Sequence, residues 1–295
     1  MKKKKRGKWL FRLIIIFICV AVAFAAAWGI LEVLDRLSQY SEGTKIEKDP
    51  VEEIVEEKPG EPDGNSPEKD ALPVNEYESS GFKNVEGIRT YEFDGVTGVA
   101  GIDVSSYQTH IDWNQVKASG IEFAMIRVGY RGYTTGKLDL DNMFLSHIDG
   151  ALDAGLDVGV YFFSQALTPE EAMEEAQYVL TWIEGYDISY PVVFDWEEVD
   201  AVARTDEMNM PMLTSCAEAF CRTIEEAGYR AAVYFNQAYG YMQFNLVSLR
   251  DYEFWLAEYA DAPSFVYDFK MWQYTNEGRV PGIEGNVDLN IYFKK

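Results

Sequence analysis

The segment Pro191–Glu197, with the sequence PVVFDWE, decides how the rest of the chain is interpreted. It is a short, nearly continuous apolar run, which is typical of a parallel β-strand covered on both faces. The run ends on two carboxylates, Asp195 and Glu197. In a barrel of parallel strands, chemistry is carried by the carboxyl ends of the strands. The segment therefore predicts a buried strand and a site at its end.

Similar runs recur on both sides of this segment. The chain alternates them with helical patterns, and helices are expected over 142–154, 168–184 and 212–227. Thr168, Pro169 and Glu171 form a strong helix start, and glycines 120, 155 and 228 stand between a helical pattern and the next strand. The strand candidates are 99–104, 123–128, 157–163, 191–195, 230–235, 254–258, 270–274 and 287–290.

This order predicts an α/β fold, an irregular TIM-like β/α barrel. The last three strands are joined by short links that leave little room for helices, so a regular eightfold repeat is not expected. We place this domain at residues 96–295. The chain as a whole is acidic: it has 26 Lys and Arg against 49 Asp and Glu and a net charge of −23. Such a charge argues against nucleic acid as a partner, because a phosphate backbone needs a basic surface.

Carboxylates follow or end three of the predicted strands: Asp103, the pair Asp195 and Glu197, and Asp288. If the strand continues through Glu197, this pair lies on one face with backbones ~6–7 Å apart. Apolar neighbours can separate the two pKa values, so that one group stays ionised while the other is an acid. Glycoside hydrolysis needs such a pair. The alternative for each acid is a helix or turn cap.

An ordered series of segments extends this interpretation. It comprises GIDVSSYQ (101–108), IDW (111–113), FAMIRVGY (123–130), GVYFFS (159–164), FDWE (194–197), WLAEY (255–259), MWQY (271–274) and VDLN (287–290). The series resembles glycoside hydrolase family 25, the Chalaropsis-type lysozymes, which are N-acetylmuramidases that cut peptidoglycan. The resemblance covers residues 98–293 and leaves out the residues before them.

The resemblance implies a groove for a peptidoglycan glycan strand and hydrolysis of the β-1,4 bond between MurNAc and GlcNAc. By position, Glu197 is then the general acid, and Asp195, Asp103 and Asp288 complete an acidic cluster at the base of the groove. The family is described as retaining. A substrate-assisted route, in which the 2-acetamido oxygen attacks and Asp195 orients it, is favoured over direct attack by Asp195.

Aromatic residues make up 15% of the chain, and sugar rings stack on them. Gln273 is a candidate to hydrogen-bond the sugar, although it could equally satisfy main-chain groups. Each aromatic candidate has ordinary core packing as its alternative. The aromatic candidates for lining the groove are Tyr161, Phe163, Tyr130, Tyr234, Trp255 and Trp272.

No cofactor or metal is expected. His110 and His147 lack partners at metal-site spacing, and helix capping by Asp141 is favoured over a Ca²⁺ site at 139–142. Two other functions remain as alternatives to a muramidase. One is a different amino-sugar glycosidase of chitinase type, and the other is a non-catalytic wall-binding module.

The residues before the barrel divide into three segments. Residues 1–12 are a basic segment expected in the cytoplasm, and 13–34 are a transmembrane signal-anchor whose uncharged core, Leu13–Leu31, can span a bilayer. Residues 35–95 are an acidic, Pro-containing disordered linker, of which 82–94 are expected at most to pack loosely onto the barrel. This organisation predicts a single-pass membrane protein, a monomer with its catalytic domain outside the cell. The alternative is secretion after signal-peptide cleavage, since Ala23-Phe24-Ala25 fits a cleavage pattern.

Overall fold

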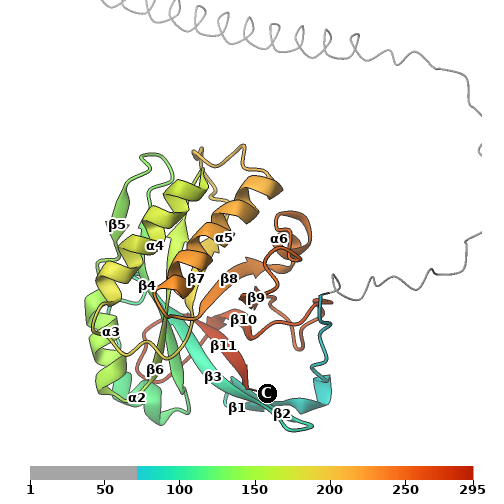
Figure 1. The fold of residues 1–295 in the computed structure, drawn as a ribbon. Helices are drawn as coiled ribbons and strands as arrows, with labels where there is room; N and C mark the ends of the chain where they lie inside the picture. The colour runs from blue at the N-terminus through green and yellow to red at the C-terminus, as the bar shows by residue number, and fades with distance from the viewer. Residues whose placement is uncertain (1–71, 295) are drawn as a thin grey trace, which may run out of the picture. The chain divides into compact units, whose positions relative to one another are not determined.

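The computed structural model describes residues 72–294, which form a closed eight-stranded barrel with additions at its edges (Figure 1). Neighbouring strands are parallel from β3 to β10, whereas β11 is antiparallel to both β10 and β3. The predicted α/β barrel is confirmed. In order around the barrel, the strands are β3 (Val96–Val104), β4 (Phe123–Arg131), β6 (Asp157–Ser164), β7 (Val192–Trp196), β8 (Ala231–Asn236), β9 (Glu253–Ala257), β10 (Met271–Gly278) and β11 (Val287–Lys294).

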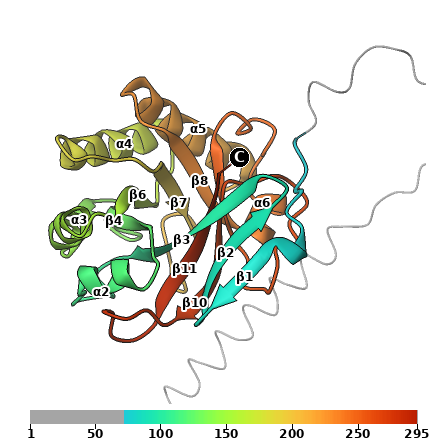
Figure 2. The ribbon, with the colours of Figure 1, turned by 90° about the horizontal axis from the view of Figure 1, so that it is seen from below.

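Helices cover one side of this barrel, as the view from below shows (Figure 2). The start of α4 follows from its sequence, since the Thr168 side chain accepts a hydrogen bond from Glu171 N and Pro169 occupies the first turn. Asn209 caps α5 in the same way through Met212 N. Asp112 caps the short helix α2, which is the helical pattern expected before Gly120. The helices are α2 (Trp113–Ala118), α3 (Phe144–Asp153), α4 (Pro169–Ile183), α5 (Met210–Glu226) and α6 (Gln237–Met242).

The barrel is irregular in the way that the short final links predict. Helices α2, α3, α4 and α5 lie between successive strands from β3 to β8, and the short α6 precedes β9. Within the described residues, no helix separates β9 from β10 or β10 from β11. The three-residue β5 (Leu138–Leu140) extends the sheet beside β4.

Alternation along the strands places one set of side chains inside the barrel. Phe123 and Tyr190 stack near the amino-terminal end with ring centroids 4.5 Å apart, and Met125 and Val193 lie in the same interior cluster. Toward the carboxyl end the interior becomes polar. Since successive residues of a strand point to opposite faces, the residue two beyond Val193 also points inward, and that residue is Asp195.

The linker prediction is wrong for its last part. Strands β1 (Phe82–Val85) and β2 (Ile88–Phe93) form an antiparallel extension that pairs with β3, and both lie on the side of the barrel that the large helices leave open (Figure 2). The ring of Tyr77 stacks on that of Phe293 at 3.8 Å, and Tyr91 is buried. The folded unit therefore includes residues 72–95 in addition to the barrel expected from residue 96.

The predicted segments 1–12 and 13–34, and the linker before residue 72, lie outside the described residues. Between residues 72 and 294, no helix combines the length and apolarity needed to cross a bilayer.

Candidate active site

A pocket of about 600 Å³ opens at the carboxyl-terminal mouth of the barrel. All four acids predicted from the strand ends contribute to its lining, although they come from segments far apart in the chain. Asp103 is at the end of β3, Asp195 on β7, Glu197 directly after β7 and Asp288 on β11. The closure of the barrel is what brings them together, because β3 and β11 are neighbours.

Asp103 is the centre of a buried hydrogen-bond network. Its Oδ2 accepts from Gln273 Nε2 at 2.9 Å and from Asn290 Nδ2 at 2.8 Å. Asn290 is oriented in turn by Trp255 Nε1, which donates to its Oδ1 at 2.9 Å. Tyr234 and Tyr259 both donate to Gln273 Oε1, at 3.2 and 3.1 Å. These bonds fix one oxygen of Asp103 in place, and a fully satisfied network of this kind is rigid.

Asp103 and Asp288 behave as a pair. They lie opposite each other in the register of β3 and β11. Burial raises the pKa of Asp103 to about 6, against the lowering effect of its hydrogen bonds. Burial and the charges of Asp103 and Glu197 raise the pKa of Asp288 to about 8, and the hydrogen bond between the two carboxyls adds to that rise. Asp288 therefore holds the proton of this pair at neutral pH and donates it toward Asp103.

The pKa values of Asp195 and Glu197 are also raised, with other charges contributing. Burial raises the pKa of Asp195 well above its usual value, the charges of Glu197 and Asp103 raise it further, and Arg127 opposes them. Burial and the Asp103 charge also raise the pKa of Glu197. Asp195 Oδ1 is buried and has no hydrogen-bond partner within residues 72–294. It therefore remains available to a ligand in the pocket.

The main chain at Glu197 is anchored by a buried glutamine. Gln165, directly after β6, donates from Nε2 to the carbonyl of Glu197 at 3.0 Å. Its Oε1 accepts from Thr205 Oγ1 at 2.7 Å. The end of β7 and the loop beyond it are thus tied to one side chain that has no exposed surface.

Alternation along the strands explains the positions of the predicted substrate-binding residues except Tyr130, which lies beyond a register shift in β4 between Arg127 and Gly129. Gln273, Tyr161, Phe163, Tyr130, Tyr234 and Trp255 all contribute to the pocket lining. Trp272 does not, and its assignment to the groove is corrected here. It stands between the inward-facing Met271 and Gln273, so its ring points out of the barrel, where it is fully buried against Phe82 and donates to the carbonyl of Glu258.

Sequence analysis missed several residues of the pocket. Tyr107, Tyr133 and Tyr259 are exposed aromatic residues on its rim, and their signal was their position just beyond β3, β4 and β9. Arg127 is inside the mouth, on the same strand face as Met125. Its place within an apolar run gave no indication that it faces the pocket.

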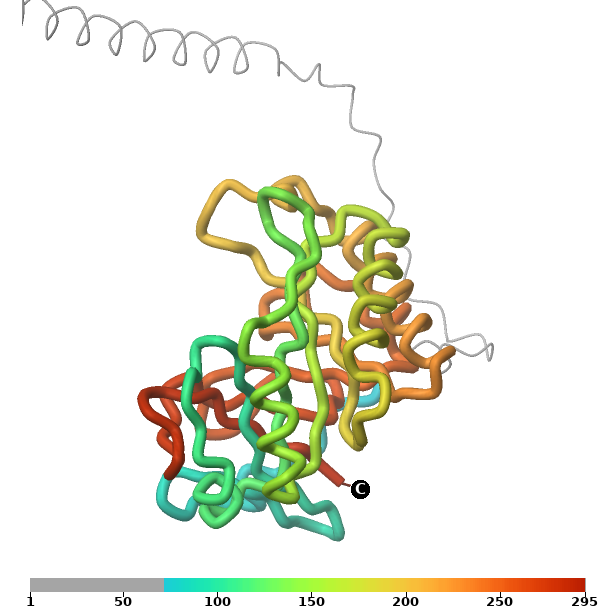
Figure 3. The backbone as a smooth tube through the Cα atoms, turned by 90° about the vertical axis from the view of Figure 1, so that its left-hand side faces the viewer, coloured from blue at the N-terminus to red at the C-terminus, as the bar shows by residue number. Residues whose placement is uncertain are grey.

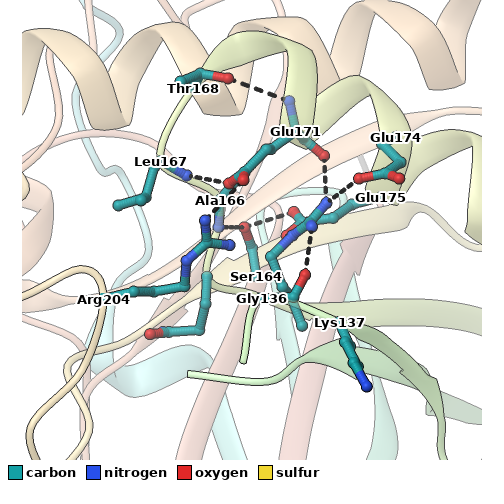
Figure 4. Close-up of polar contacts among 12 residues, drawn as sticks. Gly136, Lys137, Ser164, Ala166, Leu167, Thr168, Glu171, Glu174, Glu175 and Arg204 are labelled. Carbon is teal, nitrogen blue, oxygen red and sulfur yellow. Dashed lines mark hydrogen bonds and ion pairs between the residues drawn. The ribbon is translucent and has the colours of Figure 1, made fainter. Parts of the chain in front are cut away.

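A polar scaffold lies behind one wall of this pocket. The loop 132–137 after β4 and the loop 197–209 after β7 lie side by side (Figure 3), and Arg204 N donates to the Tyr133 carbonyl at 2.8 Å. Figure 4 shows Glu171 of α4 accepting from Arg204 Nη2 and from Leu167 N, at 2.7 and 2.8 Å. Both loops are therefore joined to the first turn of α4.

Arg131 and Glu175 form the buried part of this scaffold. Arg131 Nε donates to Glu175 Oε1 at 2.7 Å, and its other nitrogens donate to Glu174 and to the carbonyls of Gly136 and Glu171. Ser164 Oγ donates to the second oxygen of Glu175 at 2.6 Å (Figure 4). Burial raises the pKa of Glu175 to about 7 despite these partners.

The site has the composition of a carboxylate-based hydrolase. In residues 72–294, no cluster of His, Cys, Asp and Glu has the arrangement of a metal site. Asp141, for which helix capping was favoured over a Ca²⁺ site, accepts from Arg127 Nε, Ser106 N and Met143 N, whereas the N-cap position of α3 is Met143. A barrel with paired, buried acids at its carboxyl-terminal mouth is the design of a β/α-barrel glycoside hydrolase.

The chain belongs to the glycosyl hydrolases family 25, whose sequence profile matches residues 102–283. The family expected from the sequence is thereby confirmed. The chain is 29% identical over 194 residues to the autolytic lysozyme of Clostridium acetobutylicum, and the aligned region covers 65% of this chain and 55% of that protein. It is 28% identical over 245 residues to lysozyme M1 of Streptomyces globisporus, covering 77% of this chain and 80% of the relative.

Solved structures share the fold. A family 25 glycosyl hydrolase from Bacillus anthracis has a TM-score of 0.56 and 23% identity, over 71% of this chain and 94% of that one. The autolysin LytC of Streptococcus pneumoniae, solved with a synthetic peptidoglycan ligand, has a TM-score of 0.60 and 22% identity. That match covers 72% of this chain and 52% of LytC. The chain thus spans about half the length of LytC and of the autolytic lysozyme.

Proposed function

We propose that this protein is an N-acetylmuramidase, a lysozyme that hydrolyses the β-1,4 bond between MurNAc and GlcNAc in peptidoglycan. The observation that carries the proposal is the pocket of a family 25 barrel in which Glu197 and Asp195 lie beside the Asp103–Asp288 pair. The lysozymes to which the chain is similar support the choice of substrate.

In the proposed reaction, Glu197 is the general acid. Burial and the Asp103 charge raise its pKa, which favours the protonated form that a general acid needs. Its proton passes to the glycosidic oxygen as the bond from that oxygen to C1 breaks and the oxygen takes the electron pair. Gln165 holds the main chain from which this acid projects.

Asp195 is proposed to act on the 2-acetamido group. The acetamido oxygen forms a bond to C1, and a cationic ring results. Positive charge beside Asp195 favours its ionised form, so the Asp195 carboxylate balances the cation that forms during the reaction. Water then attacks C1, the bond from C1 to the acetamido oxygen breaks with its electron pair returning to that oxygen, and a proton of the water passes to Glu197, which yields retention. Direct attack by Asp195 remains the alternative route.

Product analysis tests the proposal. The full chain is incubated with purified peptidoglycan, and the products are examined by mass spectrometry after reduction. A muramidase leaves reducing ends on MurNAc, whereas reducing ends on GlcNAc contradict the proposal. The Glu197→Gln variant should release ~10²–10⁴-fold less product while still binding the wall. Undiminished release by this variant contradicts its role as the acid. Binding without release by the unaltered chain identifies a wall-binding module.

We also propose that the protein is a single-pass membrane protein whose barrel faces the outside of the cell. The support is the basic segment 1–12 before the apolar segment 13–34, together with the location of the proposed substrate. Protease treatment of intact cells should remove the barrel, and the protein should remain with membranes after a high-salt wash. A soluble protein with a new N-terminus after residue 25, the end of the Ala23-Phe24-Ala25 pattern, indicates signal cleavage instead.

The proposed unit of activity is the monomer, because one chain supplies every residue that lines the pocket. Light scattering of the purified protein at the concentrations used for activity should give the mass of one chain.

A further inference from the structure

Arg127 is a basic residue in a pocket lined mainly by acids and aromatic rings. The pocket is lined by four carboxyl groups and by two basic residues, Arg127 and Arg131. Arg131 directs its guanidinium to the scaffold behind the wall, where Glu174 and Glu175 and two carbonyls accept from it. Arg127 is therefore the cation that can serve a ligand in the pocket.

The guanidinium of Arg127 is fixed from one side only. Nε and Nη2 both approach Asp141 Oδ2, at 2.8 and 2.7 Å, and Nη2 also donates to Ser106 Oγ at 3.0 Å. Asp141 is almost fully buried, and further main-chain donors hold it in place. Nη1 donates to no residue within 72–294. The side chain thus presents its remaining donors in one orientation.

Two tyrosines frame these donors. The rings of Tyr107 and Tyr130 both lie 5.7 Å from the guanidinium carbon, and both rings are exposed at the rim. Arg127 also acts on the acids below it, since it opposes the rise that burial causes in the pKa of Asp195. Arg127 and Asp195 line the same pocket, so a sugar bound there can contact both side chains.

The chemistry of the proposed substrate supplies a matching group. MurNAc differs from GlcNAc by a lactyl ether on C3, which ends in a carboxylate in bare glycan and in an amide carbonyl where a peptide is attached. The acidic floor repels a carboxylate, and an arginine fork is the side chain that best matches one. The same guanidinium N–H groups can donate hydrogen bonds to the amide carbonyl.

We propose that Arg127, oriented by Asp141 and Ser106, binds the lactyl carbonyl or carboxylate of MurNAc and so makes the pocket select muramyl over glucosaminyl sugars. The inference rests on the proposed function for the identity of its ligand. Arg127 is a specificity-determining residue in this proposal, distinct from the acids that act on the bond.

The test compares two ligands of equal length. Binding is measured in the full chain carrying Glu197→Gln, so that neither ligand is cleaved. One ligand is the peptide-free tetrasaccharide of alternating GlcNAc and MurNAc, and the other is chitotetraose. Adding Arg127→Gln should weaken binding of the first about tenfold or more and that of chitotetraose less than twofold. Arg127→Lys, which keeps the charge but loses the fork, should fall between.

A matched control separates this effect from a general loss of structure. Arg230 also pairs with an acid, Glu253, and lies over a tyrosine ring, but it stands at the opposite end of the barrel. Arg230→Gln should leave the ratio of the two dissociation constants unchanged. An equal loss for both ligands in Arg127→Gln overturns the proposal.

A ligand-side measurement needs no change at Arg127. The lactyl carboxyls of the tetrasaccharide are reduced to alcohols, which keeps the bulk and removes the carbonyl acceptor. Binding should weaken about tenfold, and equal binding overturns the proposal even if the Arg127 variants do not fold. Because these arms measure binding, they are independent of product analysis. Wall hydrolysis with unchanged selectivity contradicts only this inference, and selectivity without hydrolysis contradicts only the proposed function.

Discussion

Asp103 and Asp288 face each other across antiparallel strands β3 and β11, and their carboxyls share one hydrogen bond. Burial raises the pKa of both, to about 6 and about 8. The barrel therefore keeps a neutral acid next to a carboxylate over much of the physiological pH range. This arrangement has direct consequences for stability and for the behaviour of Glu197.

Stability should fall as pH rises from about 4 to about 8. A carboxyl with a raised pKa in the folded state holds a proton that the unfolded chain has already released, so each pH unit in this window favours unfolding. Asp103, Glu175 and Asp288 all contribute in the same direction. Thermal unfolding at pH 5 and pH 8 checks the prediction. Asp288→Asn should flatten the dependence, and a Tm that rises toward pH 8 contradicts the assignment.

Asp103→Asn should move the alkaline limb of the activity profile to lower pH. After burial, the charge of Asp103 is the main cause that raises the pKa of Glu197. Removing the Asp103 charge lowers the pKa of Glu197, so Glu197 loses its proton at a lower pH. Activity then falls at that lower pH, because the acid must be protonated. Initial rates of wall hydrolysis between pH 4 and 9 measure the shift. An unchanged limb means that another group controls it.

Gln165→Leu should lower kcat about ten- to a hundredfold with little effect on KM, because small displacements of a catalytic group are costly. The variant loses the donor to the Glu197 carbonyl and the acceptor for Thr205. Thr205→Val removes only the second bond and should have a smaller effect. Kinetics with a soluble glycan separate the two parameters. A change in KM alone would falsify the positioning role.

Arg131→Met should destabilise the protein by about 3 kcal/mol, because it leaves Glu175 buried without its cation. Glu175→Gln should cost less, since the Arg131 guanidinium keeps the Glu174 carboxylate and two carbonyls as acceptors. Removing Arg131 also raises the pKa of Glu175 further, so the penalty should grow with pH above about 7. Urea unfolding at pH 6 and pH 8.5 checks both statements. Equal penalties at the two pH values contradict the ion-pair account.

A chain that begins at residue 96 should be markedly less stable than one that begins at residue 72. The shorter chain loses β1 and β2 and the buried Tyr77, Ile88 and Tyr91, and it exposes the face of Phe293 on which Tyr77 stacks. Tm values and soluble yields of the two chains provide the comparison. Equal Tm values show that the barrel alone is sufficient.

The barrel strands were predictable because their cores are continuous apolar runs bounded by glycine and polar residues. The β1–β2 extension was not, since it packs on the barrel through few residues and its acidic composition resembles a linker. Its local signal lay in Glu86-Gly87 and Asp94-Gly95, pairs with positive φ at both positions. Such pairs are typical of two-residue hairpin turns.

The acids of the site were predictable because each stands at or near the end of a strand. Trp272 was assigned to the groove because its side chain is aromatic. The alternation of side chains along β10, which turns Trp272 outward between Met271 and Gln273, was not considered. Arg127 shows the converse difficulty. The partner of this charged strand residue, Asp141, follows β5 and is brought beside Arg127 only when β5 folds back along β4.

The antiparallel pairing of β11 with β3 also determines when the site comes into existence. Asp103 and its counterpart on β11 are separated by most of the barrel, and such distant pairings form late because a long loop must close first. A chain that has emerged only as far as β10 lacks Asp288 and Asn290, and the network around Asp103 is incomplete. The network around Asp103 is therefore complete only after β11 pairs with β3 and the ring of strands closes.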